Sequence, residues 1–153
     1  MNLAKKKIYL AADHAGFAHK EALRDWLITQ GNEVVDLGPG DFDPEDDFPE
    51  FMAKAAKAVQ ADLENSCAII LGGSGQGEAM AANRFQGIRA TVYYGGPDEI
   101  IMLSRAHNNA NILALGARFL SLDEVKKSAW LWLKAPFGQE EKYVRRNQQL
   151  DQF

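Results

Sequence analysis

Residues 67–78 read Cys-Ala-Ile-Ile-Leu-Gly-Gly-Ser-Gly-Gln-Gly-Glu, an apolar run that passes directly into a glycine-rich loop and an acid. The run over residues 67–71 lacks alternation of polar and apolar residues, which is typical of a parallel strand covered on both faces. Similar runs lie at residues 8–12, 33–37, 88–94 and 112–115. The sequence therefore predicts a five-stranded parallel sheet.

Helical patterns separate these runs. Ala22, Leu23, Trp26 and Leu27 recur at helical spacing, and Gly31 follows as the residue that ends a helix. Further helices are expected from residue 49, near residue 77, after residue 97, over 121–134 and, as a polar helix, over 139–150. This alternation predicts an α/β fold, a three-layer α/β/α sandwich with a Rossmann-like sheet in the order 2-1-3-4-5, formed by one domain over residues 1–153.

The composition excludes several classes of partner. The 153 residues contain 17 Lys and Arg against 21 Asp and Glu, and the net charge of −4 disfavours broad binding to nucleic acid or anionic membranes. No apolar run approaches the roughly 20 residues of a membrane-spanning helix. A single cysteine, Cys67, permits no internal disulfide, so a cytoplasmic location is expected, with Cys67 as core filler rather than a nucleophile.

Two polar segments follow the first and third predicted strands and face each other across the expected crevice: residues 13–16 and 72–78. A glycine-rich loop that leads into a helix directs several backbone N–H groups at one point, which predicts an anion site. Gly72 and Gly77 have Walker A spacing, but Glu78 replaces the lysine, and the dinucleotide pattern fails as well. ATP, GTP and dinucleotides are therefore disfavoured.

The polar side chains of these segments each allow two interpretations. Glu78 either complements the helix dipole or acts as a general base beside an oxyanion site. Ser74 is a turn residue or an oxyanion donor. Asp13 and His14 are a capping acid with an exposed histidine, or site residues. The acidic segment 41–50 is interpreted as a solvated loop.

For two further groups of residues, the expected role depends on their position in the fold. His107 precedes the fifth strand, at the opposite edge of the sheet from the glycine loop, so it is either part of a polar turn or reaches such a site from another subunit. Lys142 and Arg146 share one face of the last helix, which suits a phosphate, although an exposed basic helix paired with Glu140 or Glu141 has the same pattern.

The chain also resembles a known family, ribose-5-phosphate isomerase type B, which includes the galactose-6-phosphate isomerase subunits. The resemblance covers nearly the whole chain. It is carried in order by the segments 12–17 (Ala-Asp-His-Ala-Gly-Phe), 47–49 (Asp-Phe-Pro), 73–77 (Gly-Ser-Gly-Gln-Gly), 81–84 (Ala-Ala-Asn-Arg), 87–90 (Gly-Ile-Arg-Ala), 107–111 (His-Asn-Asn-Ala-Asn) and 115–118 (Leu-Gly-Ala-Arg).

The resemblance implies a cofactor-free, metal-free aldose–ketose isomerase of pentose phosphate metabolism, which interconverts ribose 5-phosphate and ribulose 5-phosphate. One branch of the family uses a cysteine base at the position of Gly72, whereas this chain looks like the branch that uses Glu78. It implies a homodimer that can pair into tetramers, with each active site shared between subunits. By the same resemblance, Ser74 and the amides of Gly73, Gly75 and Gly77 stabilise the enediolate, His107 assists ring opening, Asp13 and Asn108 hold the sugar, and His14, Arg118, Lys142 and Arg146 hold the phosphate.

Three departures from the family pattern concern the substrate. Phe48 stands where tyrosine is usual, Lys142-Tyr143 replaces an Arg-His pair, and Glu140 and Glu141 replace glycines. Isomerisation of another sugar phosphate, a tetrose or a hexose such as galactose 6-phosphate, therefore stays an alternative. A noncatalytic sugar-phosphate sensor and a flavodoxin-like nucleotide binder are the alternatives from other classes.

Overall fold

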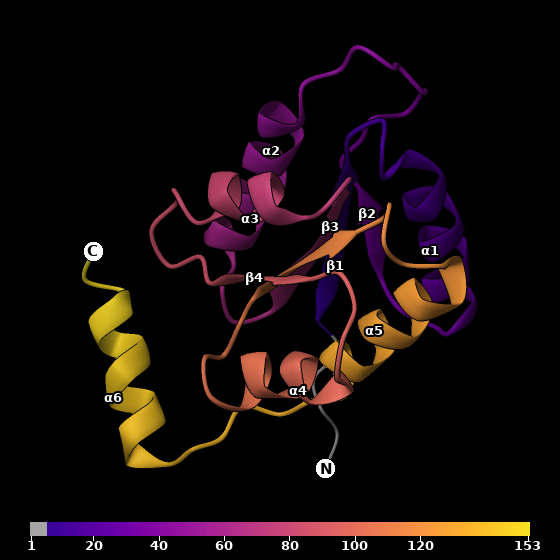
Figure 1. Cartoon of the computed structure of the whole chain (residues 1–153). Coiled ribbons are helices and arrows are strands. Elements are labelled where there is room, and N and C mark those ends of the chain that lie inside the picture. Colours follow the sequence, from indigo (N-terminus) through magenta and orange to yellow (C-terminus); the bar gives the residue numbers. More distant parts are fainter. Residues whose placement is uncertain (1–5) are drawn as a thin grey trace.

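The computed structural model describes residues 6–153, so the first five residues of the expected domain lie outside the described residues. Strands and helices alternate over this range (Figure 1). The strands are β1 (Lys7–Ala12), β2 (Val34–Asp36), β3 (Ser66–Gly72), β4 (Ala90–Tyr93) and β5 (Ile112–Gly116). The helices are α1 (Phe17–Thr29), α2 (Phe48–Ala61), α3 (Gln76–Ala82), α4 (Asp98–Ala106), α5 (Leu122–Lys134) and α6 (Glu141–Leu150).

The sheet is parallel throughout and has the order β2-β1-β3-β5-β4. The predicted α/β class is confirmed, but the predicted order 2-1-3-4-5 is wrong, because β5 and β4 exchange places. Every residue of β5 is buried, whereas three of the four residues of β4 are only half-buried. A strand with neighbours on both sides must be apolar throughout, so β5 lies beside β3 and β4 forms the edge.

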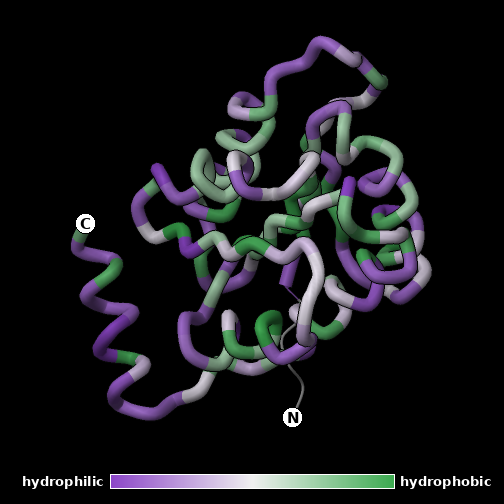
Figure 2. The backbone as a smooth tube through the Cα atoms, viewed as in Figure 1, coloured by the Kyte–Doolittle hydropathy of each residue, from purple (hydrophilic) through white to green (hydrophobic). Residues whose placement is uncertain are grey.

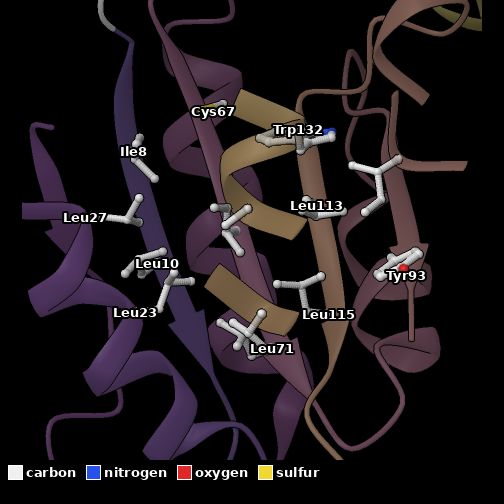
Figure 3. Close-up of a cluster of buried hydrophobic side chains, with 14 of the residues drawn as sticks. Ile8, Leu10, Leu23, Leu27, Cys67, Leu71, Tyr93, Leu113, Leu115 and Trp132 are labelled. Carbon is white, nitrogen blue, oxygen red and sulfur yellow. The ribbon is translucent and has the colours of Figure 1, made fainter. Parts of the chain in front are cut away.

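Alternate residues of the strands point to opposite faces of the sheet and form two cores. Ile69 and Leu71 pack with α1, α4 and α5, as Figure 3 shows for Leu71, Leu113 and Trp132. Ala68 and Ile70 face the other way and pack with α2 and α3. The helices therefore cover both faces of the sheet (Figure 1).

Helix α6 projects from the rest of the molecule (Figure 1) and is largely hydrophilic along its length (Figure 2). It is attached at a few points: the Asn147 side-chain amide donates to the His107 carbonyl oxygen at 2.9 Å, and Arg89 forms a 2.8 Å ion pair with Asp151. Among residues 6–153, no helix is long and apolar enough to cross a membrane.

Candidate active site

A cavity of about 260 Å³ lies at the carboxyl ends of β1 and β3. The loops that follow these strands and β5 supply most of its wall, and the first residues of α2 and α3 supply the rest. The lining residues are Asp13, His14, Ala15, Phe48, Gly73, Ser74, Gly77, Glu78 and Arg118. The two polar segments that the sequence placed across a crevice thus meet in one cavity, as predicted.

Glycines let the β3–α3 loop pack closely against its neighbours. Gly75 has a left-handed backbone with φ of 80°, and a Cβ atom there would lie 3.1 Å from the carbonyl oxygen of Ala114 in β5. The loop also receives hydrogen bonds from the chain after β5, since the Arg118 N–H donates to the Gly73 carbonyl oxygen at 3.0 Å. These contacts fix the loop at the start of α3, and the first N–H groups of a helix have no partner within the helix and point towards an anion site.

Glu78 lies in the first turn of α3, and only 4% of the residue is exposed. Burial raises the pKa of its carboxyl group, and the charge of Asp13 acts in the same direction, while backbone hydrogen bonds and Arg118 partly offset this rise. A purely dipole-complementing acid would lie at the helix surface in water. This buried carboxylate borders the cavity, which favours the interpretation as a base.

Asp13 caps the turn before α1 and also borders the cavity. Its Oδ1 atom accepts hydrogen bonds from the N–H groups of Ala15 at 2.9 Å and Gly16 at 3.2 Å, which fixes the turn before α1. The residue is 6% exposed and lines the cavity. The Ser74 hydroxyl oxygen accepts from the Gln76 N–H at 3.2 Å, so Ser74 stabilises the loop turn and also lines the cavity.

His14 has a partner that the sequence analysis missed. Its Nδ1 atom lies 2.8 Å from Oδ1 of Asp46, in the acidic segment expected to be a solvated loop. This hydrogen bond raises the pKa of the His14 imidazole; burial and Arg118 oppose the rise, and Asp13 supports it. The only signal in the sequence was that Asp46 directly precedes the motif over residues 47–49.

The structure does not bring every expected residue to this cavity. His107 lies at the amino end of β5 and stacks on Tyr143 of α6, with ring centroids 4.2 Å apart. Lys142 and Arg146 are exposed on α6, and Lys142 forms a 3.2 Å ion pair with Glu140. Asn108 lines a different cavity, of about 480 Å³, near the end of the chain. Within one protomer these four residues are separate from the glycine loop.

Cys67 is buried in β3, and burial raises the pKa of its thiol to about 11. A thiol in that state stays protonated at neutral pH and is a poor nucleophile. The prediction that Cys67 fills the core is confirmed. Among the residues that the structure describes, no group of three or more His, Cys, Asp or Glu side chains has the arrangement of a metal site.

Comparisons with known proteins show which family the chain is similar to. The family model described as Ribose/Galactose Isomerase matches residues 8–150. Ribose-5-phosphate isomerase B of Mycobacterium tuberculosis is 34% identical over 140 residues, which cover 92% of this chain and 85% of that protein. The Escherichia coli enzyme of the same name is 37% identical over 132 residues, which cover 86% of each.

Solved structures extend the similarity to three dimensions. The crystal structure of ribose-5-phosphate isomerase B from Mycoplasma genitalium with bound ribulose-5-phosphate matches with a TM-score of 0.90 at 34% identity, covering 95% of this chain and 94% of that one. The protein from Clostridium thermocellum matches with a TM-score of 0.88 at 37% identity, covering 95% of each chain. From its sequence and its fold, the chain belongs to the ribose/galactose isomerase family.

Proposed function

We propose that this protein interconverts ribose 5-phosphate and ribulose 5-phosphate without a cofactor, with Glu78 as the base. The observation that carries the proposal is the buried Glu78 carboxylate, which borders the same cavity as the amides of the glycine loop. Proton abstraction next to a carbonyl group requires this pair, a base and a site for the negative charge that forms. The ligand in the Mycoplasma genitalium structure supports the choice of sugar phosphate.

The reaction begins on the open-chain aldose. Glu78 removes the proton from C2, the C–H electrons form the C1–C2 double bond, and the carbonyl electrons move to O1. The cis-enediolate is stabilised by the amides of Gly73, Gly75 and Gly77 and by the Ser74 hydroxyl group. A proton passes from the O2 hydroxyl to O1, and protonated Glu78 delivers its proton to C1, which leaves the ketone at C2.

Different charged residues bind the sugar and the phosphate of the substrate. Asp13 accepts hydrogen bonds from sugar hydroxyl groups, and His14 and Arg118 bind the phosphate at the same cavity. In a homodimer that can assemble further into tetramers, the partner supplies His107 for ring opening, Asn108 for the sugar, and Lys142 and Arg146 for the phosphate. We place the enzyme in the cytoplasm, where its single thiol stays reduced.

The test is exchange of the C2 hydrogen with solvent deuterium during incubation with ribose 5-phosphate. The wild-type protein should incorporate deuterium, and Glu78→Gln should lower turnover by about a hundredfold or more. Glu50→Gln is the matched control, because Glu50 is also an acid in the first turn of a helix but has a side chain that is 73% exposed. A Glu78→Gln variant with near-normal turnover would refute the assignment of the base.

A second candidate is isomerisation of a tetrose or hexose phosphate. Phe48 lines the cavity without the hydroxyl group that tyrosine would supply, so one sugar contact differs from the family pattern. A comparison of kcat/KM over sugar phosphates with four to six carbons decides between these substrates. A sugar-phosphate sensor would instead gain thermal stability from ribose 5-phosphate with no deuterium incorporation.

A further inference from the structure

The loop between β2 and α2 turns a single acid towards His14. Its other acids, Asp41, Asp43, Glu45 and Asp47, are exposed, whereas the Asp46 side chain is only 7% exposed. The backbone N–H of Asp46 donates to the carbonyl oxygen of Asp43 at 3.3 Å, and this turn directs the Asp46 side chain inward. Asp46 is therefore distinct from the solvated acids around it.

One oxygen of Asp46 holds His14 at two points. Oδ1 accepts the backbone N–H of His14 at 3.0 Å and lies 2.8 Å from Nδ1 of the imidazole. A carboxylate is an acceptor only, so Nδ1 carries the proton of this bond. Oδ2 is buried and has no hydrogen-bond partner among residues 6–153, so the carboxylate charge is balanced chiefly through His14.

The arrangement leaves Nε2 of His14 for a ligand. The side chain is 31% exposed and borders the cavity, and no group of residues 6–153 is hydrogen-bonded to Nε2. Arg118 borders the same cavity, and its positive charge lowers the pKa of His14. Burial acts in the same direction. The acids that face His14 are Asp46 and Asp13, with Glu78 on the wall of the same cavity. Of these, Asp46 makes the direct contact that offsets the repulsion.

We propose that Asp46 is a positioning residue that holds His14 as a cation with its Nε2–H directed at the phosphate group of the substrate. The inference rests on the proposed function, in which His14 and Arg118 bind the phosphate. It adds the reason that His14 and Arg118 can both be positively charged at one cavity: the Asp46 carboxylate offsets their repulsion. Without Asp46, His14 loses its proton at a lower pH and the phosphate retains Arg118 alone from this protomer.

The kinetic test uses Asp46→Asn, which keeps the shape and an acceptor oxygen but removes the charge. The control is Glu45→Gln, which makes the same change of charge at the neighbouring exposed residue. The KM for ribose 5-phosphate is measured for both variants and wild type at pH 6 and pH 8. We expect the ratio of variant to wild-type KM to rise with pH for Asp46→Asn and to reach about 10-fold at pH 8, with kcat within a few-fold. Taking the ratio cancels the ionisation of the substrate.

A purely structural role of Asp46 would shift KM by the same factor at both pH values. That result, an unchanged KM, or an equal effect of Glu45→Gln would overturn the proposal. The second readout is an NMR titration of the His14 ring, which is tractable because the chain has only three histidines. Asp46→Asn should lower the pKa of His14, and an unchanged titration would also overturn the proposal.

The NMR experiment separates failure of this proposal from failure of the proposed function. If the wild-type protein does not isomerise ribose 5-phosphate, inorganic phosphate serves as the probe of the His14 resonances at pH 7. Asp46→Asn should then require about 10-fold more phosphate than wild type for the same shift. Equal phosphate affinities would overturn the role of Asp46, whereas active wild-type enzyme with unaltered Asp46→Asn kinetics would overturn it and leave the isomerase function intact.

Discussion

The carboxyl group of Glu78 occupies the space that a Cβ atom on Gly72 would need. Gly72 ends β3, and Glu78 lies in the first turn of the following helix, so the two residues meet across the glycine loop. A side chain at residue 72 therefore requires the Glu78 carboxylate to leave this position. The family resemblance implies a base either from a cysteine at the position of Gly72 or from Glu78. The overlap gives a physical reason why the two bases are alternatives.

Gly72→Ala should therefore inactivate the enzyme without removing any polar group. The added methyl group displaces the Glu78 carboxylate, and a misplacement of about 1 Å lowers turnover by roughly a hundredfold. The comparison is Gly40→Ala, since no atom lies within 4 Å of a Cβ atom at Gly40. Kinetics and a crystal structure of Gly72→Ala would check this. Full activity with an unmoved Glu78 would contradict the overlap.

The burial of Glu78 also predicts a stability effect with a definite sign. Its raised pKa means that the protonated form favours the folded state, so this contribution is present at acid pH and is lost as pH rises through the folded-state pKa. Glu78→Gln is neutral at every pH. Its melting temperature should match that of wild type near pH 4 and exceed it by a few degrees at pH 7.

Thermal unfolding of both proteins across this pH range measures the difference directly. The Glu45→Gln variant corrects for the loss of one negative charge, because Glu45 is exposed and lies outside the cavity. A Glu78→Gln protein that is less stable than wild type at pH 7 would mean that the ionised carboxylate stabilises the fold, contrary to the effect of its burial.

Much of this site could be predicted because its parts are local in sequence. The glycine loop and the Asp13-His14 pair each follow a strand directly, and Glu78 lies at the start of the helix after the loop. Parallel strands bring such segments to one edge of the sheet. These segments do line one cavity. The prediction of one shared cavity required only that β1 and β3 be neighbours in the sheet, and the structure confirms that they are.

The predicted order of β4 and β5 was wrong because both strands are short apolar runs in the sequence and nothing in the runs shows which one lies at the edge. Their difference lies in burial, which depends on whether a strand has neighbours on both sides: β4 at the edge is mostly half-buried and β5 is fully buried. The role of Asp46 was missed for a similar reason. Six acids occur within residues 41–50, and nothing in their spacing shows which one the loop turns inward. Only the tertiary contact with His14 distinguishes it.

The ring of Phe48 covers part of the glycine loop, so it should influence the choice of sugar. A Cβ atom at Gly77 would lie 2.8 Å from Cζ of Phe48, which places the ring tip against this loop. Phe48→Tyr adds a hydroxyl group at the cavity and should lower KM for ribose 5-phosphate about 2- to 10-fold, the effect of one hydrogen bond. The matched change Phe42→Tyr, at a residue that is 59% exposed, should have no effect.

Measuring Phe48→Tyr on sugar phosphates with four to six carbons tests whether the ring selects the substrate. If Phe48 selects the substrate, Phe48→Tyr should change kcat/KM by different factors for sugars of four, five and six carbons. Equal factors for all of them would show that the ring contributes to the shape of the loop and makes no selective contact with the sugar.

The separation of His107 from Glu78 makes the shared site directly testable. His107 precedes the amino end of β5, whereas Arg118 and the glycine loop lie at the carboxyl end, and β5 alone spans about 16 Å. Stacking on Tyr143 and the bond from Asn147 to its backbone tie His107 to α6 of its own protomer. His107 can then serve a glycine loop only on a second copy of the chain.

Mixing two inactive variants should therefore restore activity. In a heterodimer of Glu78→Gln and His107→Asn, one site carries both substitutions, and the other combines an intact Glu78 with an intact His107. Random exchange of subunits makes half of the dimers heterodimers, so activity should recover to about a quarter of the wild-type value. A double Glu78→Gln/His107→Asn protein mixed with itself gives the background. No recovery after unfolding and refolding the two variants together would mean that each site is built within one protomer.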